Sequence, residues 1–236
     1  MPSRRLQALL AVLVLAIPLA ALAGRQGVLF LATFDDSIND TTPAFEAQVG
    51  MFDASAINNV FKVVATPEGD GVLQITAPAN LTEPAYLEGL LASKFIGSKV
   101  EIQLAITPGQ TNASLAFRAE DDGSTGAIDC EFGDDGVVVV NGGSVAFTYQ
   151  AGIDHLVCLT LSVPLVGLPT WTMSISWDGG REGPQLFTTS GLLAVLPGSM
   201  LKIDRLVIEK PADGTAGTFQ VDDLGVFGLQ QLDSKN

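Results

Sequence analysis

The chain is short of the residues that many enzymes and metal sites use, beginning with histidine. His155 is the only histidine among 236 residues. A zinc site built on two histidines is therefore excluded, and no HExxH or CxxC pattern occurs. A Ser-His-Asp triad would need His155, yet no Gly-x-Ser-x-Gly motif supplies its nucleophile. We expect His155 to have a structural role at the entrance of a strand.

Long apolar runs are also scarce, because only the N-terminus carries one. Arg4 and Arg5 precede an apolar stretch from Ala8 to Leu22, and Ala21-Leu22-Ala23 has the small-x-small pattern of a signal-peptidase site. This order predicts a cleaved signal peptide over residues 1–23, with an uncleaved N-terminal anchor as the alternative. No later run approaches the roughly 20 residues that span a bilayer, so we expect no membrane span in the mature chain.

These features predict an exported protein that is secreted, periplasmic or at the cell surface. Residues 24–236 are too few for several large domains, and no long linker or internal repeat divides them. We therefore expect a single domain, with its ordered part running from about residue 28 to 229.

Basic residues are few, since 12 Lys and Arg stand against 26 Asp and Glu. Loss of Arg4 and Arg5 with the signal peptide would take the net charge from −14 to −16. Such a polyanion repels nucleic acid and anionic membrane surfaces at long range, so both are poor partners. Clustered carboxylates suit a hard cation such as Ca²⁺ instead.

Only two cysteines are present, and their pairing stays open. In an oxidising compartment Cys130 and Cys158 would form a disulfide worth about 3–4 kcal/mol on loop-entropy arguments. Strand alternation argues otherwise, because Cys130 shares a face with Ile128 and Phe132 whereas Cys158 lies on the face opposite Leu159. One cysteine pointing inward and one outward would prevent the bond.

Period-two alternation dominates the chain, and helical periodicity is nearly absent. Turn sequences rich in Gly, Asp and Asn separate the alternating runs, in keeping with 25 glycines and 12 prolines. So many short strands favour an all-β, antiparallel two-sheet β-sandwich. The predicted strands are 28–34, 61–65, 71–77, 87–94, 100–106, 114–118, 126–132, 137–140, 144–149, 155–163, 171–177, 200–209 and 218–227.

Three stretches in the second half of the chain resemble the concanavalin A-like lectin/glucanase jelly rolls, including laminin G-like modules. Residues 149–161 look like the loop that enters a central strand, and residues 171–179 look like the next strand closed by an Asp-Gly hairpin. Residues 219–227 are similar to the closing strand with its Val-Asp-Asp sequence. The resemblance implies a jelly roll that binds an extracellular glycan or a surface protein.

The same resemblance allows a test for glycoside hydrolysis. Laminarinase-type members carry Glu-x-Asp-x-Glu on one strand, so that alternation places all three acids on one face. Here Asp129 and Glu131 match the second and third acids, while Ala127 occupies the place of the nucleophile. A retaining mechanism would not run without that residue. The alternative to a non-catalytic module is therefore a carbohydrate-active enzyme that uses Glu131 and Asp129 with a partner carboxylate from a distant strand.

Calcium is the cofactor that the resemblance implies. In many sugar-binding jelly rolls the first and last strands meet, and an acidic residue from each helps to hold a structural Ca²⁺. By resemblance, Asp35 and Asp222 or Asp223 would supply such ligands here. The alternative is that Asp35 lies in a turn and that the other two form a polar edge.

Sugar recognition would use an aromatic ring supported by carboxylates or amides. Trp171 and Trp177 share a face with apolar neighbours and are typical of core, so Tyr86 is the ring we expect to be exposed. We therefore predict an exported, non-catalytic binding module whose ligand site includes Tyr86, Asp129 and Glu131. An enzyme and a structural component of an extracellular assembly remain alternatives.

Overall fold

The computed structural model describes residues 26–38, 47–53, 60–78, 81–121, 127–212 and 216–229. Nearly all of this is strand, with two short 3₁₀ turns, η1 (Asp35–Ser37) and η2 (Gly180–Glu182). Within these ranges, none of the helical turns is long and apolar enough to cross a membrane. The predicted signal peptide, residues 1–23, lies outside the described residues.

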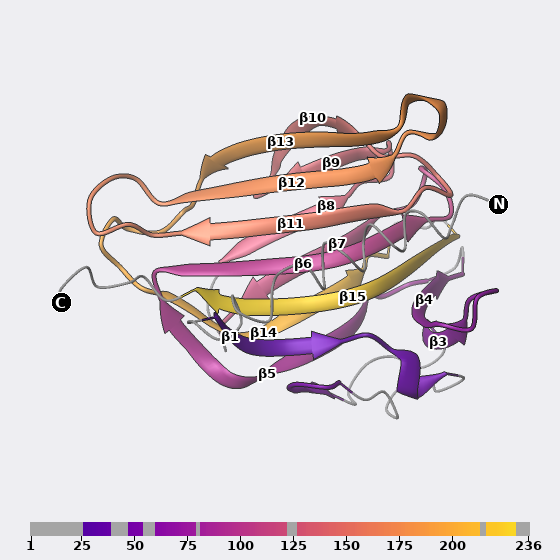
Figure 1. Cartoon of the computed structure of the whole chain (residues 1–236), viewed down its shortest axis with the longest axis horizontal. Coiled ribbons are helices and arrows are strands. Elements are labelled where there is room, and N and C mark those ends of the chain that lie inside the picture. The colour runs from indigo at the N-terminus through magenta and orange to yellow at the C-terminus, as the bar shows by residue number, and fades with distance from the viewer. Residues whose placement is uncertain are drawn as a thin grey trace.

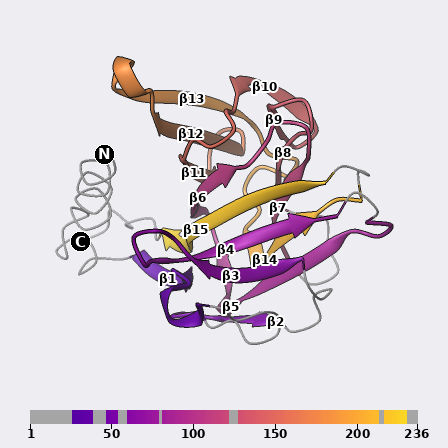
Figure 2. The same cartoon turned by 90° about the vertical axis from the view of Figure 1, so that its right-hand side faces the viewer.

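Two antiparallel sheets form the layers of the molecule (Figures 1 and 2). The eight-stranded sheet has the order β13-β12-β11-β6-β15-β4-β3, and β1 pairs with the later half of β15. Its strands are β1 (Gln26–Ala32), β3 (Phe61–Ala65), β4 (Gly71–Ala77), β6 (Lys99–Pro108), β11 (His155–Ser162), β12 (Thr170–Asp178), β13 (Pro184–Leu192) and β15 (Gly217–Leu229).

The seven-stranded sheet has the order β10-β9-β8-β7-β14-β5-β2 and covers the inner face of the first sheet. Its strands are β2 (Met51–Asp53), β5 (Ala85–Gly97), β7 (Leu115–Glu120), β8 (Ile128–Phe132), β9 (Val137–Val140), β10 (Gly143–Thr148) and β14 (Leu201–Lys210). The antiparallel β-sandwich predicted from alternation is therefore confirmed.

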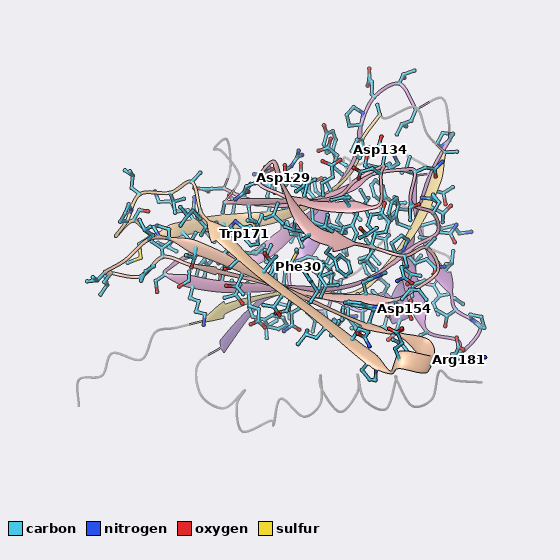
Figure 3. All side chains as sticks on the ribbon, turned by 90° about the horizontal axis from the view of Figure 1, so that it is seen from above. Phe30, Asp129, Asp134, Asp154, Trp171 and Arg181 are labelled. Atoms are coloured by element: carbon cyan, nitrogen blue, oxygen red, sulfur yellow. The ribbon has the colours of Figure 1, made fainter. Side chains whose placement is uncertain are left out.

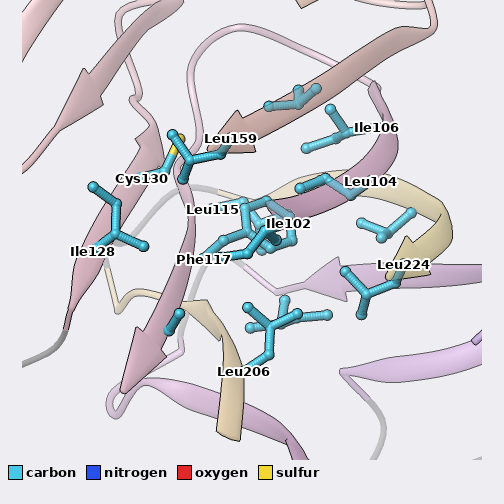
Figure 4. Packing of buried hydrophobic residues seen from close by; sticks show 14 of the residues in the cluster. Ile102, Leu104, Ile106, Leu115, Phe117, Ile128, Cys130, Leu159, Leu206 and Leu224 are labelled. Atoms are coloured by element: carbon cyan, nitrogen blue, oxygen red, sulfur yellow. The ribbon is translucent and has the colours of Figure 1, made fainter. Parts of the chain in front are cut away.

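The core lies between the two layers because alternate residues of most strands point inward. Val100, Ile102 and Leu104 of β6 are buried, whereas the residues between them are partly exposed. They meet inward-facing side chains of the other sheet such as Phe117 and Leu206 (Figure 4). This packing fixes the register, since a shift by one residue would turn every apolar side chain outward.

The cysteine alternatives are decided by the same alternation. Cys130 on β8 points into the core and is buried, whereas Cys158 on β11 points away from the core. Both are free thiols, so the disulfide interpretation was wrong. Burial raises the pKa of each thiol to about 12, which keeps both protonated and weakly nucleophilic.

Candidate functional site

A cavity of about 630 Å³ opens at one end of the sandwich. One wall is the segment between β10 and β11, and the other is the hairpin between β12 and β13. Figure 3 shows Asp154 of the first wall and Arg181 of the second at the same end of the molecule. The lining residues are Gln150, Gly152, Ile153, Asp154, Trp177, Asp178, Gly179, Gly180, Glu182 and Gln185.

The first wall is held by contacts to the end of β6. The Gly152 amide donates to the carbonyl of Pro108 at 2.7 Å, and the Asp154 carboxylate accepts a hydrogen bond from the Thr107 hydroxyl. Gly152 has a positive φ of 71°, a conformation that favours glycine. These contacts fix the segment against the end of β6.

Tyr149 anchors the start of this wall from inside the protein. Its ring is buried, and its hydroxyl donates to the Gly133 carbonyl at 2.6 Å and lies 3.3 Å from the Ala113 carbonyl. Burial, reinforced by the charges of Asp135 and Asp134, raises the pKa of this phenol. The hydroxyl therefore stays protonated and remains a donor.

We expect Tyr149→Phe to lower the free energy of unfolding by about 1–3 kcal/mol, because it leaves a buried carbonyl without its donor. Urea unfolding followed by circular dichroism measures the change. Tyr86→Phe is the matched control, since Tyr86 is exposed and should shift stability by less than about 0.5 kcal/mol. Equal stabilities for Tyr149→Phe and the wild type would show that this anchor is dispensable.

The second wall is a hairpin whose turn depends on glycine. Gly180 and Gly183 have φ values of 65° and 77°, and the Gly179 amide donates to the Gly183 carbonyl at 3.1 Å. The Asp178 carboxylate accepts from the Gly180 amide at 2.9 Å. The Gln185 side-chain amide lies 3.3 Å from the Gly183 carbonyl. The hairpin therefore presents carboxylate and amide groups on a defined backbone.

Four aromatic side chains meet behind the cavity and join the two sheets. Phe147 of β10 contacts His155, Trp177 and Phe187, with ring centroids 5.1–5.8 Å apart. His155 is buried, as expected for a structural residue, and burial lowers its pKa. Trp177 is only partly buried and lines the cavity, while Trp171 lies in the core. The core interpretation therefore holds for Trp171 but misses the position of Trp177.

This arrangement suits a ligand with an apolar face and many hydroxyl groups. An indole ring packs against the C–H face of a sugar, while amides and carboxylates satisfy hydroxyl groups around its rim. Asp154, Asp178 and Glu182 bring three negative charges to the cavity, and none of the lining residues is basic. The cavity should therefore accept neutral or amino-bearing ligands and repel anionic ones.

The predicted ligand residues lie elsewhere, on the outer face of the seven-stranded sheet. Asp129 and Glu131 both point outward from β8, and Arg118 of β7 pairs in register with Asp129. Arg118 also forms an ion pair with Glu209 at 2.5 Å and lies over the Tyr86 ring, 5.8 Å from its centroid. The structure thus places Tyr86 and Asp129 beside one arginine, with Glu131 next to Asp129 on the same face and all three away from the cavity.

Partial burial raises the pKa of both predicted carboxyls on this face. For Asp129 the nearby Arg118 opposes the effect, while for Glu131 the charges of Asp129, Asp134 and Glu209 add to it. Ala127, which stands where a nucleophile would be required, immediately precedes β8. The face is charged, Arg118 is paired with Glu209, and neither carboxyl lines the cavity described above.

The predicted calcium residues come together where β1 and β15 meet. The charges of Asp35, Asp70 and Asp223 all act on Asp222, and burial with these charges raises the pKa of Asp222 to about 7. Burial, together with the charges of Asp35 and Asp70, also raises the pKa of Asp223. Asp70 is a member of this cluster that sequence reasoning missed. It directly precedes β4, and only the fold brings it near Asp222 and Asp223.

The donor chemistry of this cluster suits Ca²⁺, but its present arrangement does not form a metal site. One oxygen of Asp35 accepts from the Gly71 amide at 2.8 Å, and one oxygen of Asp222 accepts from the Asp223 amide at 2.8 Å. Within the described ranges, no three or more acidic, His or Cys side chains are grouped to hold a metal ion. Calcium at Asp35, Asp222 and Asp223 therefore stays a prediction.

Comparisons with known proteins support the fold. No protein-family model matches the chain, and no curated protein matches it. Among solved structures, the marine PL-14 alginate lyase from Aplysia kurodai is similar over 71% of this chain and 87% of its own, with a TM-score of 0.54 and 9% identity. Lectin UEA-II in complex with galactose covers 84% of this chain and 96% of its own, at a TM-score of 0.48 and 14% identity.

A sialidase is similar over 81% of this chain, with a TM-score of 0.48 and 15% identity, but the match spans only 20% of the sialidase. At such low identities these likenesses describe the fold alone. The match to the alginate lyase, with a TM-score of 0.54, supports the two-sheet β-sandwich and nothing finer.

Proposed function

We propose that this chain is an exported, non-catalytic module that binds neutral glycans in the cavity between the 149–154 segment and the β12–β13 hairpin. The observation that carries the proposal is the half-buried Trp177 ring in a cavity rimmed by Gln150, Gln185 and three carboxylates. An indole ring beside hydrogen-bonding groups is a common arrangement for binding a sugar without catalysing a reaction. The apolar run of residues 8–22 supports export.

The charge of the cavity defines the class of glycan. Three lining carboxylates against the single Arg181 of the hairpin would disfavour uronic and sialic acids. Neutral sugars and amino sugars carry hydroxyl and amino groups that donate hydrogen bonds to these carboxylates. A protonated amine can also form a cation–π contact with the face of the indole ring. The proposed ligand is thus a neutral or amino-bearing glycan of a cell surface or matrix.

A glycan array probed with the full chain tests this proposal. We expect signals for neutral or amino-bearing glycans and at least about tenfold weaker signals for sialylated or uronate-containing ones. A matched array probed with Glu131→Gln should give the same pattern, because Glu131 lies on the other sheet. Binding confined to acidic glycans, or none on a broad array, would contradict the proposal.

The alternative of a carbohydrate-active enzyme rests on the pair Asp129 and Glu131. Their raised pKa values are compatible with acid catalysis, but a retaining mechanism also needs a nucleophile. Incubation with neutral polysaccharides separates the two functions. Release of reducing ends that stops in Glu131→Gln would favour the enzyme, and unchanged polymers with retained binding would favour the module.

A further inference from the structure

The end of the sandwich opposite the cavity carries an unusual concentration of exposed apolar side chains. Seven of the ten large apolar side chains that are exposed within the described ranges lie there. They come from the end of β5, from the β11–β12 loop, and from the end of β13 with the segment that leads to β14. The seven residues, called the apolar end below, are Ile96, Leu165, Val166, Leu168, Leu192, Leu196 and Met200.

Strand pairing places these three segments together. Leu161 at the end of β11 pairs with Val100 and Trp171, and Trp171 pairs with Gly191 of β13. In the seven-stranded sheet, Leu201 at the start of β14 pairs with Gly97 of β5. Figure 1 shows the turns that join these strands at its left side.

Backbone hydrogen bonds between the segments hold the apolar end in shape. The Val163 amide donates to the Ser98 carbonyl at 2.7 Å, and the Leu193 amide donates to the Pro169 carbonyl at 3.0 Å. Within this frame Val166 is 92% exposed and Leu196 is 78% exposed. Both side chains therefore project from a defined scaffold into the surroundings.

The charge of this end is opposite to that of the whole chain. Lys99 begins β6 next to the apolar end, and Lys202 of β14 pairs with Ile96. The segments that build this end contain no acidic residue, and the carboxylates nearest in sequence to the two lysines, Glu101 and Asp204, accept hydrogen bonds from Gln103 and Arg205. These segments are 26–34, 93–100, 161–171, 190–203 and 224–229.

The acidic residues Asp134, Asp154, Asp178 and Glu182 lie in turns at the far end of the same strands. A strand of eight residues such as β11 is about 25 Å long, whereas the screening length at physiological salt is about 8 Å. The repulsion expected from these four carboxylates is therefore screened at the apolar end.

The chain also enters the domain at this end. Gly27 of β1 pairs with Gly228, and Gly228 pairs with Val100. The apolar run of residues 8–22 stops only a few residues before β1 begins at Gln26. If that run is kept as the uncleaved N-terminal anchor, the alternative to a signal peptide, its contact with a bilayer would bring the apolar end to the same surface.

We propose that the apolar end docks on an anionic phospholipid surface, with the three loops inserted among the headgroups and Lys99 and Lys202 facing lipid phosphates. Separate projecting loops suit a fluid surface that deforms around them. A symmetric contact with a second copy would instead bring these lysines toward their own equivalents, which is repulsive. The proposal places the glycan cavity on the side facing away from the membrane.

Depth-sensitive fluorescence on the full chain tests this docking. An environment-sensitive NBD dye is attached at Val166→Cys, and in a second sample at Arg181→Cys, both in a Cys158→Ser background. With vesicles of equimolar phosphatidylcholine and phosphatidylglycerol, we expect a blue shift and a stronger emission at position 166 and none at position 181. Identical responses at the two positions, or no response at either, would overturn the proposal.

Substitution of the loops supplies the second measurement. The double variant Val166→Glu/Leu196→Glu changes two exposed side chains, so it should fold normally and bind these vesicles at least about tenfold more weakly. Unchanged binding would contradict the proposal. So would a wild-type dimer in light scattering that the double variant dissociates, because it would identify a second copy as the occupant.

Discussion

A chain carrying Asp222→Asn will be more stable than the wild type by about 2 kcal/mol or more at about pH 8, and equally stable near pH 4. Burial and the charges of Asp223, Asp35 and Asp70 raise the pKa of Asp222 to about 7 in the folded state. The folded protein thus holds this proton more tightly than the unfolded chain, whose aspartates titrate near pH 4.

The sign follows from linkage. Below about pH 4 both states are protonated and the group has no effect, and stability is lost as pH rises from about 4 through about 7. Asparagine is neutral throughout, and its side-chain oxygen still accepts the hydrogen bond of the Asp223 amide. The variant should therefore keep the local geometry while it removes the charge repulsion.

Urea unfolding at several pH values measures this difference. Asp36→Asn is the matched control, because Asp36 is an exposed neighbour of the cluster and its substitution removes the same charge. An Asp222→Asn chain that is less stable than the wild type at high pH would contradict the repulsion account. The same two proteins test the calcium prediction. If millimolar Ca²⁺ raises the melting temperature of the wild type and not that of Asp222→Asn, the calcium prediction is supported.

The second large effect is expected at Trp177, where Trp177→Ala should weaken glycan binding by at least about tenfold. The ring is the only aromatic side chain that lines the cavity among the described residues, so its loss removes the apolar platform. Isothermal titration with a glycan selected from the array measures the change in affinity.

Two further variants keep this prediction falsifiable. Trp177 also contacts Phe147 and His155, so truncation is expected to lower stability as well. Gln185→Ala leaves that packing intact and should still weaken binding several-fold. Tyr86→Ala, an exposed ring on the other sheet, should bind like the wild type. Loss of binding in Tyr86→Ala with full binding in Trp177→Ala would relocate the site.

The strands could be predicted because alternation is a local signal. The boundaries expected for 61–65, 71–77 and 137–140 are those of β3, β4 and β9. β2 was missed because it has only three residues. β13 was missed because its polar side chains and Pro184 leave no clear apolar face on an edge strand.

The site was harder to predict because it joins segments that only the fold brings together. Trp177 lies on the inward face of β12, which predicts a core position. It stands near the end of the strand, however, where the sandwich opens into the cavity. The spacing of Asp129 and Glu131 correctly placed both on one face, but it gave no indication of Arg118 beside them. Such contacts depend on which strands pair, and local sequence patterns do not determine that pairing.

Chemical-shift mapping of the isotope-labelled chain, titrated with a bound neutral glycan, tests the central claim most directly. We expect the largest shifts at the Trp177 indole N–H and at the backbone amides of Gln150, Gly179 and Gly180. Amides of β8 and β14, beside Asp129 and Glu209, should not move. Shifts confined to that outer face, or no shifts at all with saturating glycan, would contradict a binding site in the cavity.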